Sequence, residues 1–140
     1  MTPEQLEMVR SSYGMLGQGA PAMAADFYRR LFDAEPSARE LFVESADVMA
    51  VKFAAELDAI VEAITSYETF APRVHALAVR HLHLGVQTHH YRAVGEALLG
   101  ALAGRLEEVW DPDVEAAWHR AYNLVAEMMM ATAATIDHRA

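Results

Sequence analysis

Residues 72–85, PRVHALAVRHLHLG, contain the clearest periodic pattern in this chain. Apolar residues recur there at intervals of three and four positions, which is the spacing of an α-helix with one buried side. They are Val74, Leu77 and Ala78, and His81 continues the same spacing on the same face. We expect Pro72 to begin this helix and Gly85 to end it, because proline suits a first helical turn and glycine a left-handed cap. The apolar face of the helix therefore includes a histidine.

The same spacing continues along the rest of the chain, and no segment alternates as a β-strand would. The sequence therefore predicts an all-α fold. The expected helices cover about residues 3–17, 21–32, 48–65, 72–84, 88–106 and 112–136, with one short helical turn after Glu35. Thr88 is expected to cap the fifth of these helices, and Gly100 and Gly104 to let it pack closely against a neighbour.

Length, charge and cysteine content limit the classes of protein. The 140 residues suffice for one domain of ordinary size, so we expect residues 1–140 to form a single domain. The excess of 20 acidic over 11 basic residues gives a formal charge of −9, which repels nucleic acid and anionic lipid. The chain has no cysteine, which excludes disulfides, thiolate metal sites and iron–sulfur clusters.

No segment of the sequence indicates export or a membrane span. The first residues show no basic stretch followed by an apolar one, and no stretch approaches the roughly 20 apolar residues of a spanning helix. We therefore expect a cytoplasmic protein, a monomer or homodimer, with no membrane or nucleic-acid partner.

His81 is the strongest candidate for a functional residue. It must either hydrogen-bond within the core or give one ring nitrogen to a metal and the other to a carbonyl group. The pattern alone leaves both open, and a satisfied core histidine is the commoner case. His83 lies about 200° further round the helix and is expected to face solvent. His89 and His90 are also expected on the solvated surface.

The order of elements resembles that of a globin. Tyr28 borders the buried face of the second expected helix, and Phe42 is expected to turn inward after the short helical turn. More narrowly, the chain resembles, over nearly its full length, the heme domain of bacterial flavohemoglobins and their single-domain relatives. The segments that carry the resemblance are DFYRRLF at 26–32, ELF at 40–42, VRH at 79–81, YRAVGEALL at 91–99 and AWHRAY at 117–122.

This resemblance implies a globin fold around heme b, iron protoporphyrin IX. It makes His81 the proximal ligand of the iron, with the second ring nitrogen orienting the imidazole. It makes Tyr28 the distal hydrogen-bond donor to bound dioxygen. The residues that it arranges around the heme are Phe42, stacked on the porphyrin, Tyr91, behind the proximal imidazole, Val86, Val94 and Leu98, along the proximal and rear walls, and Lys52, near a propionate.

Two positions depart from the family pattern. Where the family has a glutamine and a bulky apolar residue on the distal helix, this chain has Met49 and Phe53. Met49 cannot donate a hydrogen bond; it either fills the pocket, the commoner role of methionine, or ligates the iron when no gas is bound. The family glutamate that partners the proximal histidine falls on Ala133, so the push of negative charge on His81 is expected to be weaker.

Reversible binding of dioxygen, with nitric oxide as a further ligand, for oxygen binding or delivery is the first function that the resemblance implies. Nitric oxide dioxygenase activity is the second, and it would need a separate reductase because each turnover leaves ferric heme and we expect no flavin or nicotinamide domain here. The alternatives are a heme-based gas or redox sensor, an electron-transfer protein with His81 and Met49 as axial ligands, and a helical protein without heme.

Overall fold

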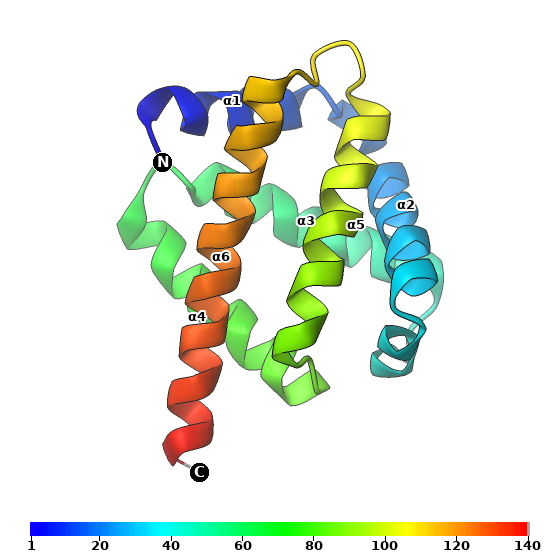
Figure 1. Ribbon diagram of the computed structural model, residues 1–140, viewed down its shortest axis with the longest axis vertical. Coiled ribbons are helices and arrows are strands. Elements are labelled where there is room, and N and C mark those ends of the chain that lie inside the picture. The colour runs from blue at the N-terminus through cyan, green and yellow to red at the C-terminus, as the bar shows by residue number, and fades with distance from the viewer. Residues whose placement is uncertain (140) are drawn as a thin grey trace.

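The chain forms a set of helices joined by short turns (Figure 1), and the computed structural model describes residues 1–139, with side chains through residue 136. Within this range there is no β-strand, which confirms the all-α prediction. None of the helices described combines enough length with enough apolar character to cross a membrane. The helices are α1 (Pro3–Gly14), η1 (Gly17–Gly19), α2 (Ala20–Ala34), η2 (Pro36–Leu41), α3 (Ala46–Ala63), α4 (Tyr67–Leu84), α5 (Thr88–Arg105) and α6 (Pro112–Arg139), where η denotes a 3₁₀ helix.

Local hydrogen bonds explain where several helices begin and end. At the start of α1, the Gln5 amide donates to the Thr2 hydroxyl (3.1 Å) and the Thr2 amide donates to the Gln5 side chain (3.0 Å). At the start of α6, the Val114 amide donates to the Asp111 carboxylate (2.9 Å). Gly85 ends α4 in the left-handed region, with φ of 90°, which confirms the cap predicted for it.

α4 begins earlier than the sequence indicates. The prediction that Pro72 starts this helix is wrong, because the helix starts at Tyr67 and Pro72 lies inside it. The added turn begins at Ser66, whose carbonyl accepts a hydrogen bond from the Phe70 amide (2.8 Å). Phe70 is 3% exposed, and burying its ring in the core offsets the loss of the one backbone hydrogen bond that Pro72 cannot donate.

α1 ends earlier than predicted. It stops at Gly14, and Gly17–Gly19 form the separate turn η1. Gly17 has a φ of 51°, a left-handed conformation that cannot continue a right-handed helix. The short turn predicted after Glu35 is present as η2, and the other helices lie within one turn of their predicted positions.

The helices pack against one another in pairs (Figure 1). α5 and α6 lie side by side, and α2 packs against both α5 and α3. α6 also packs against α4 and α1. α3 and α4, which carry several of the predicted site residues, contact each other directly.

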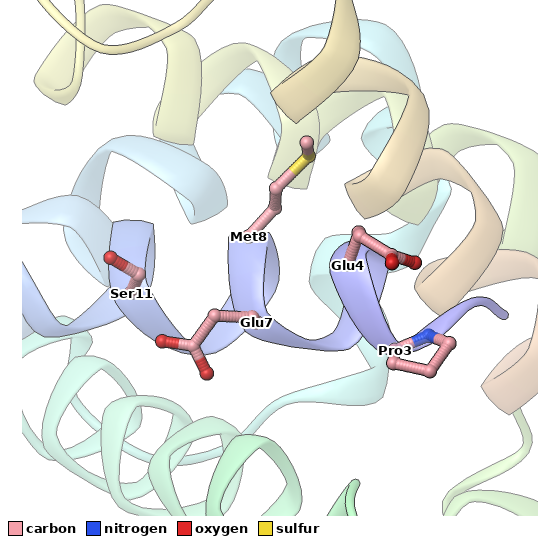
Figure 2. Close-up of a pocket in the computed structure, with 5 residues that line it drawn as sticks. All are labelled: Pro3, Glu4, Glu7, Met8 and Ser11. Atoms are coloured by element: carbon pink, nitrogen blue, oxygen red, sulfur yellow. The ribbon is translucent and has the colours of Figure 1, made fainter.

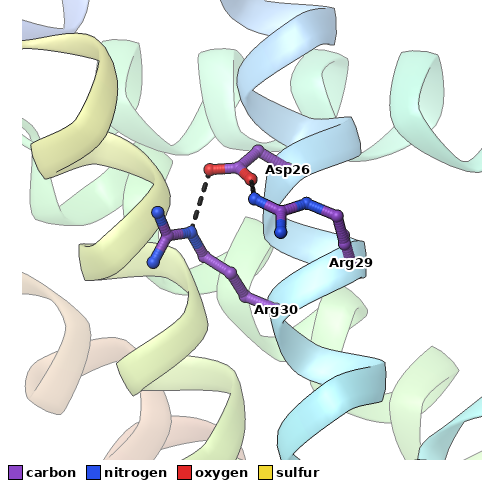
Figure 3. Close-up of polar contacts among 3 residues, drawn as sticks. All are labelled: Asp26, Arg29 and Arg30. Atoms are coloured by element: carbon purple, nitrogen blue, oxygen red, sulfur yellow. Dashed lines mark hydrogen bonds and ion pairs between the residues drawn. The ribbon is translucent and has the colours of Figure 1, made fainter.

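An arginine of α2 lies against α5. Arg30 Nε donates to one oxygen of the Asp26 carboxylate (2.9 Å), and Arg29 donates to the other oxygen (Figure 3). The Arg30 guanidinium lies against α5 at Gly100, where a Cβ atom would come within 2.8 Å of Nη1. The close packing predicted for Gly100 is present, with a side chain as the group that approaches, whereas at Gly104 a Cβ atom would lie 3.6 Å from Arg30, an ordinary contact.

α1 is held to the rest of the fold by polar contacts inside the core. Trp118 Nε1 on α6 donates to the Ser12 hydroxyl (2.9 Å), which donates in turn to the Met8 carbonyl (2.6 Å). The Tyr13 hydroxyl donates to the Ala54 carbonyl on α3 (3.3 Å). These bonds connect α1 to both α6 and α3.

α5 and α6 are joined through Tyr122. The Tyr122 hydroxyl on α6 donates a hydrogen bond to the Tyr91 carbonyl on α5. The Tyr122 ring lies over Gly95, where a Cβ atom would come within 2.6 Å of the ring edge. Glycine at this position therefore allows the two helices to approach.

Gly95→Ala should destabilise the fold by about 1–3 kcal/mol, because the added methyl group meets a ring that its own hydrogen bond holds in place. The free energy of unfolding, from urea denaturation, measures the effect. Gly104→Ala is the matched control on the same helix: its Cβ would lie 3.6 Å from Arg30, an ordinary contact, and alanine favours a helix by up to about 1 kcal/mol. Equal stability of the two variants would show that the Tyr122 ring moves freely.

Candidate functional site

His81 lies half-buried in the last turn of α4, with its ring held in one orientation. Its Nδ1 is 2.9 Å from the carbonyl oxygen of Leu77. Because a carbonyl only accepts, Nδ1 carries the proton and Nε2 keeps its lone pair. Burial lowers the pKa of His81, as does the charge of Arg80, whereas the bond to Leu77 and the charge of Glu56 oppose that shift. His81 is thus a neutral imidazole at neutral pH, the form that ligates metals.

The chain turns sharply after His81, at residues 85–87, which we call the α4–α5 corner. The Val86 amide donates to the His81 carbonyl (3.0 Å), so the corner is bonded to the last turn of α4. A Cβ atom on Gly85 would lie 3.5 Å from a methyl group of Leu41 in η2. The corner therefore contacts the segment that leads to Phe42.

Five aromatic side chains from α2, α3 and the end of η2 form a continuous group, which we call the aromatic cluster. The Tyr28 ring stands edge-on to the rings of Phe42 and Phe53, with centroid distances of 5.4 and 5.7 Å. It stacks on Phe32 at 5.8 Å. Phe27 stacks on Phe53 at 4.3 Å. The structure thus brings together three of the predicted site residues: Tyr28, Phe42 and Phe53.

The Tyr28 hydroxyl differs from the hydroxyls of Tyr13 and Tyr122 in its hydrogen bonding. The hydroxyls of Tyr13 and Tyr122 donate to backbone carbonyls, whereas that of Tyr28 makes no hydrogen bond to any residue the structure describes. Burial raises the pKa of Tyr28 to about 12, and the negative charge of Glu44 also raises it. Tyr28 therefore keeps its proton and can donate it in a hydrogen bond.

Met49 and Lys52 lie on α3, before Phe53. Met49 is 7% exposed and packs into the interior. Lys52 is exposed, and its ammonium group lies 2.6 Å from the Glu44 carboxylate. This ion pair connects α3 to the loop that follows η2. The roles of Met49 as pocket filler or ligand, and of Lys52 near a propionate, stay predictions.

Tyr91, Val94 and Leu98 follow one another along α5. Leu98 is buried, and Tyr91 and Val94 are partly buried against the core. Burial raises the pKa of Tyr91. Within residues 1–139, no hydrogen bond, ion pair or ring stacking joins His81 to these residues or to the aromatic cluster, so their common role around one cofactor stays a prediction.

A charged group between α3 and α4 was not found from the sequence. Glu56 on α3 lies 3.1 Å from Arg80 and 3.7 Å from Arg73, both on α4. Its Oε1 atom is buried and accepts no hydrogen bond from any described residue. Glu56 follows Phe53 by one turn and Arg80 precedes His81, so these ion pairs connect α3 and α4 next to two predicted site residues. Arg73 and Arg80 share one face of α4, and this spacing was the signal in the sequence that could have predicted the ion pairs.

His90 was also misjudged from the sequence. The prediction that it is solvated is wrong: it is 6% exposed, and its Nδ1 accepts a hydrogen bond from the Gln87 amide (2.8 Å). Gln87 is the residue that caps α5, and its carbonyl accepts a hydrogen bond from the His90 amide (2.9 Å), so Gln87 and not Thr88 is the cap. The sequence carried no usual signal for this cap, because a capping box has serine or threonine at the cap and glutamate or glutamine three positions later. His83 and His89 are exposed, which confirms that prediction.

His81 offers a metal one oriented nitrogen. Within the described part of the chain, no group of three or more histidine, cysteine, aspartate or glutamate side chains could hold a metal ion.

Hollows on the surface occur along α1 and contain none of the predicted site residues. In Figure 2 the side chains around one hollow project in different directions from a single helix, and they are Pro3, Glu4, Glu7, Met8 and Ser11. A second hollow lies between α1 and α3, next to Asp58 and Glu62. These acidic surfaces carry no further group that points to a ligand.

Known proteins match most of this chain. A model of the globin family matches residues 25–129. The chain is 32% identical over 134 residues to a flavohemoprotein of Deinococcus radiodurans, which covers 93% of this chain and 33% of that protein. It is 28% identical to a flavohemoprotein of Bordetella parapertussis and 27% identical to one of Vibrio cholerae, again over 93% of this chain and over 33% and 34% of those proteins. The chain spans about a third of the length of these relatives.

The chain therefore belongs to the globin family. The resemblance to flavohemoglobins stated from the sequence segments is confirmed. All predicted site residues, from Tyr28 to Leu98, lie within the range that the family model matches.

Glu44→Gln should lower the pKa of Tyr28, because it removes a negative charge that disfavours the phenolate. The ring-carbon NMR resonance of Tyr28, followed through an alkaline titration, measures this pKa. Glu40→Gln makes the same change of charge on η2 and serves as the control. An equal shift of the Tyr28 pKa in both variants would show that Glu44 affects Tyr28 no more than Glu40 does.

Proposed function

We propose that this globin binds heme b and, through it, reversibly binds dioxygen, and that it serves in oxygen binding or delivery. The observation that carries the proposal is the state of His81, a neutral imidazole whose Nδ1 is bonded to the Leu77 carbonyl and whose Nε2 has no hydrogen-bond partner among the described residues. A histidine oriented through its other nitrogen is the proximal ligand of heme iron in globins.

The groups present fit a heme. Among the described residues, no further histidine, cysteine or carboxylate side chains form a metal site with His81. A porphyrin, whose own nitrogens ligate the iron, is compatible with this single ligand. The aromatic cluster would give a flat macrocycle apolar surroundings, and Tyr28 offers a hydroxyl without a partner among the described residues. The relatives are called flavohemoproteins, a name that states that they contain heme, and this supports the same assignment.

Each residue has a distinct task in this proposal. Bound heme would supply the iron that takes up a diatomic gas. His81 would hold the cofactor, and the Leu77 carbonyl would keep the imidazole from rotating. Tyr28, protonated because its pKa is about 12, would donate a hydrogen bond to the gas. Met49 and Phe53 would exclude water from the same side.

Other predicted residues would line the cofactor. They are Phe42, Tyr91, Val86, Val94 and Leu98. Lys52 would neutralise a propionate, which requires its ammonium group to exchange the Glu44 carboxylate for that of the cofactor.

Absorption spectra of the purified chain test the proposal: ferric, then dithionite-reduced, then exposed to dioxygen. A Soret band and a stable oxygenated spectrum would support it. A low-spin reduced spectrum before any gas is added would indicate that a side chain of the protein is the sixth ligand of the iron, and Met49 is the first candidate. This result would favour electron transfer or sensing. No Soret band after addition of hemin would overturn the proposal.

His81→Ala should lose hemin about tenfold faster than the unmodified chain, or more, because the axial bond is removed. Transfer of hemin to an excess of a heme-scavenging protein measures the rate. His83→Ala removes an exposed imidazole two residues away and should retain hemin. Equal retention by the two variants would contradict the assignment of His81 as ligand.

Tyr28→Phe should raise the dissociation rate of dioxygen about tenfold, since a hydrogen bond to a partly charged acceptor contributes about 1–2 kcal/mol. Stopped-flow displacement of dioxygen by carbon monoxide measures the rate. Tyr67→Phe, at a tyrosine that is 74% exposed, is the control. An unchanged rate in Tyr28→Phe would remove this residue from the site.

Oxidation of nitric oxide is the second candidate, favoured by the similarity to flavohemoproteins. One nitric oxide, one dioxygen and one electron yield one nitrate, so sustained turnover needs an electron donor such as a separate reductase. Nitric oxide consumption, measured with and without an added flavin reductase and its nicotinamide substrate, separates the two functions. Consumption that continues only with the reductase supports turnover, and consumption of one equivalent in both cases supports dioxygen binding.

A further inference from the structure

The first turn of α5 contains two histidines, at a place where positive charge is disfavoured. The N-terminus of a helix carries a partial positive charge from its aligned peptide groups. His89 and His90 occupy the second and third positions of α5, and their ring centroids are 4.0 Å apart. Protonation of both would set two cations against each other and against the helix dipole.

His90 is built into the cap of α5 as an acceptor. Its Nδ1 accepts the hydrogen bond of the Gln87 amide at 2.8 Å, which requires Nδ1 to have no proton. Its Nε2 therefore carries the proton in the neutral ring. The ring is 6% exposed, so water cannot readily replace Gln87 as a partner. Protonation of His90 would set an N–H group of the ring against an N–H group of the backbone.

We infer that His90 is an acid-sensitive cap: its protonation releases the first turn of α5 and loosens the α4–α5 corner. The corner connects this cap to α4, because the Val86 amide donates to the His81 carbonyl and Gln87 follows directly. Loss of the cap frees the Gln87 amide and the residues next to it. The inference concerns the polypeptide itself and holds whether or not the chain binds heme.

The charged groups that face His90 come from two elements. His89 lies beside it on α5, and Glu35 faces it from the junction of α2 and η2. Burial lowers the pKa of His90 and His89 lowers it further, while Glu35 acts in the opposite direction. The Glu35 carboxylate already accepts a hydrogen bond from the Ser37 hydroxyl (2.5 Å). The imidazole is therefore neutral at neutral pH.

The direction of the pH effect follows from this environment. A histidine whose folded-state pKa is depressed binds its proton more readily in the unfolded chain. The stability that neutral His90 confers is therefore complete above the ordinary histidine pKa of about 6.5 and is lost as the pH falls below it. Acid should weaken this end of α5 before it weakens the core.

Two variants of the chain as purified separate His90 from its neighbour. His90→Gln keeps an acceptor at the third position of α5, which suits a capping box, but cannot be protonated. His89→Gln removes the exposed imidazole and leaves His90 in place. The unfolding equilibrium constant, from urea denaturation between neutral and mildly acidic pH, should rise about fivefold more in the unmodified chain than in His90→Gln, the effect of one lost cap. His89→Gln should keep most of that rise.

The inference is wrong if acid destabilises His90→Gln as much as the unmodified chain, or if His89→Gln alone removes the effect. If His90→Gln does not fold, NMR and hydrogen exchange of the unmodified chain test the inference instead. The ¹⁵N resonance of His90 Nδ1 should show an unprotonated nitrogen at neutral pH. The protection of the Gln87 amide against hydrogen exchange should fall at the pH at which that nitrogen gains its proton, and separate midpoints would overturn the inference.

Discussion

A polar ring can remain on the apolar face of α4 because the Leu77 carbonyl accepts a hydrogen bond from His81 Nδ1. A buried donor left without a partner would cost about 1–3 kcal/mol, and the ring would have no fixed orientation. The surrounding contacts reinforce this arrangement. The ion pairs of Glu56 hold α4 against α3, and Gly85 ends the helix so that the next amide bonds back to the His81 carbonyl. One backbone oxygen thus decides which ring nitrogen is available for chemistry.

His81 and His90 lie at opposite ends of the same corner and use the same ring atom in opposite ways. In His81, Nδ1 donates to a carbonyl and leaves Nε2 as a free base. In His90, Nδ1 accepts from an amide, so the proton is on Nε2 and the basic nitrogen is already in use. Burial lowers the pKa of both. Burial therefore does not distinguish a candidate ligand from a structural histidine. The direction of the hydrogen bond at Nδ1, donated in His81 and accepted in His90, does distinguish them.

The helices followed from apolar spacing in the sequence, because periodicity reports which face of a segment is buried. Features set by contacts distant in sequence did not. Pro72 signals a helix start locally, but burial of Phe70 extends α4 beyond it. His90 looks solvated beside His89, but the start of α5 packs so that its ring is covered. Spacing also left His81 undecided between core and ligand; the roles given to it and to Tyr28 came from resemblance to a family.

The bond between Trp118 and Ser12 has an optical consequence. The indole of Trp118 is 2% exposed where α1 meets α6, and its ring centroid lies 6.3 Å from that of Tyr13. The chain has two tryptophans, and the other, Trp110, is only partly buried. Indole emission moves to longer wavelength when water reaches the ring, so the fluorescence of Trp118 reports whether α1 is docked. The protein therefore carries an intrinsic probe of its N-terminal helix that needs no label.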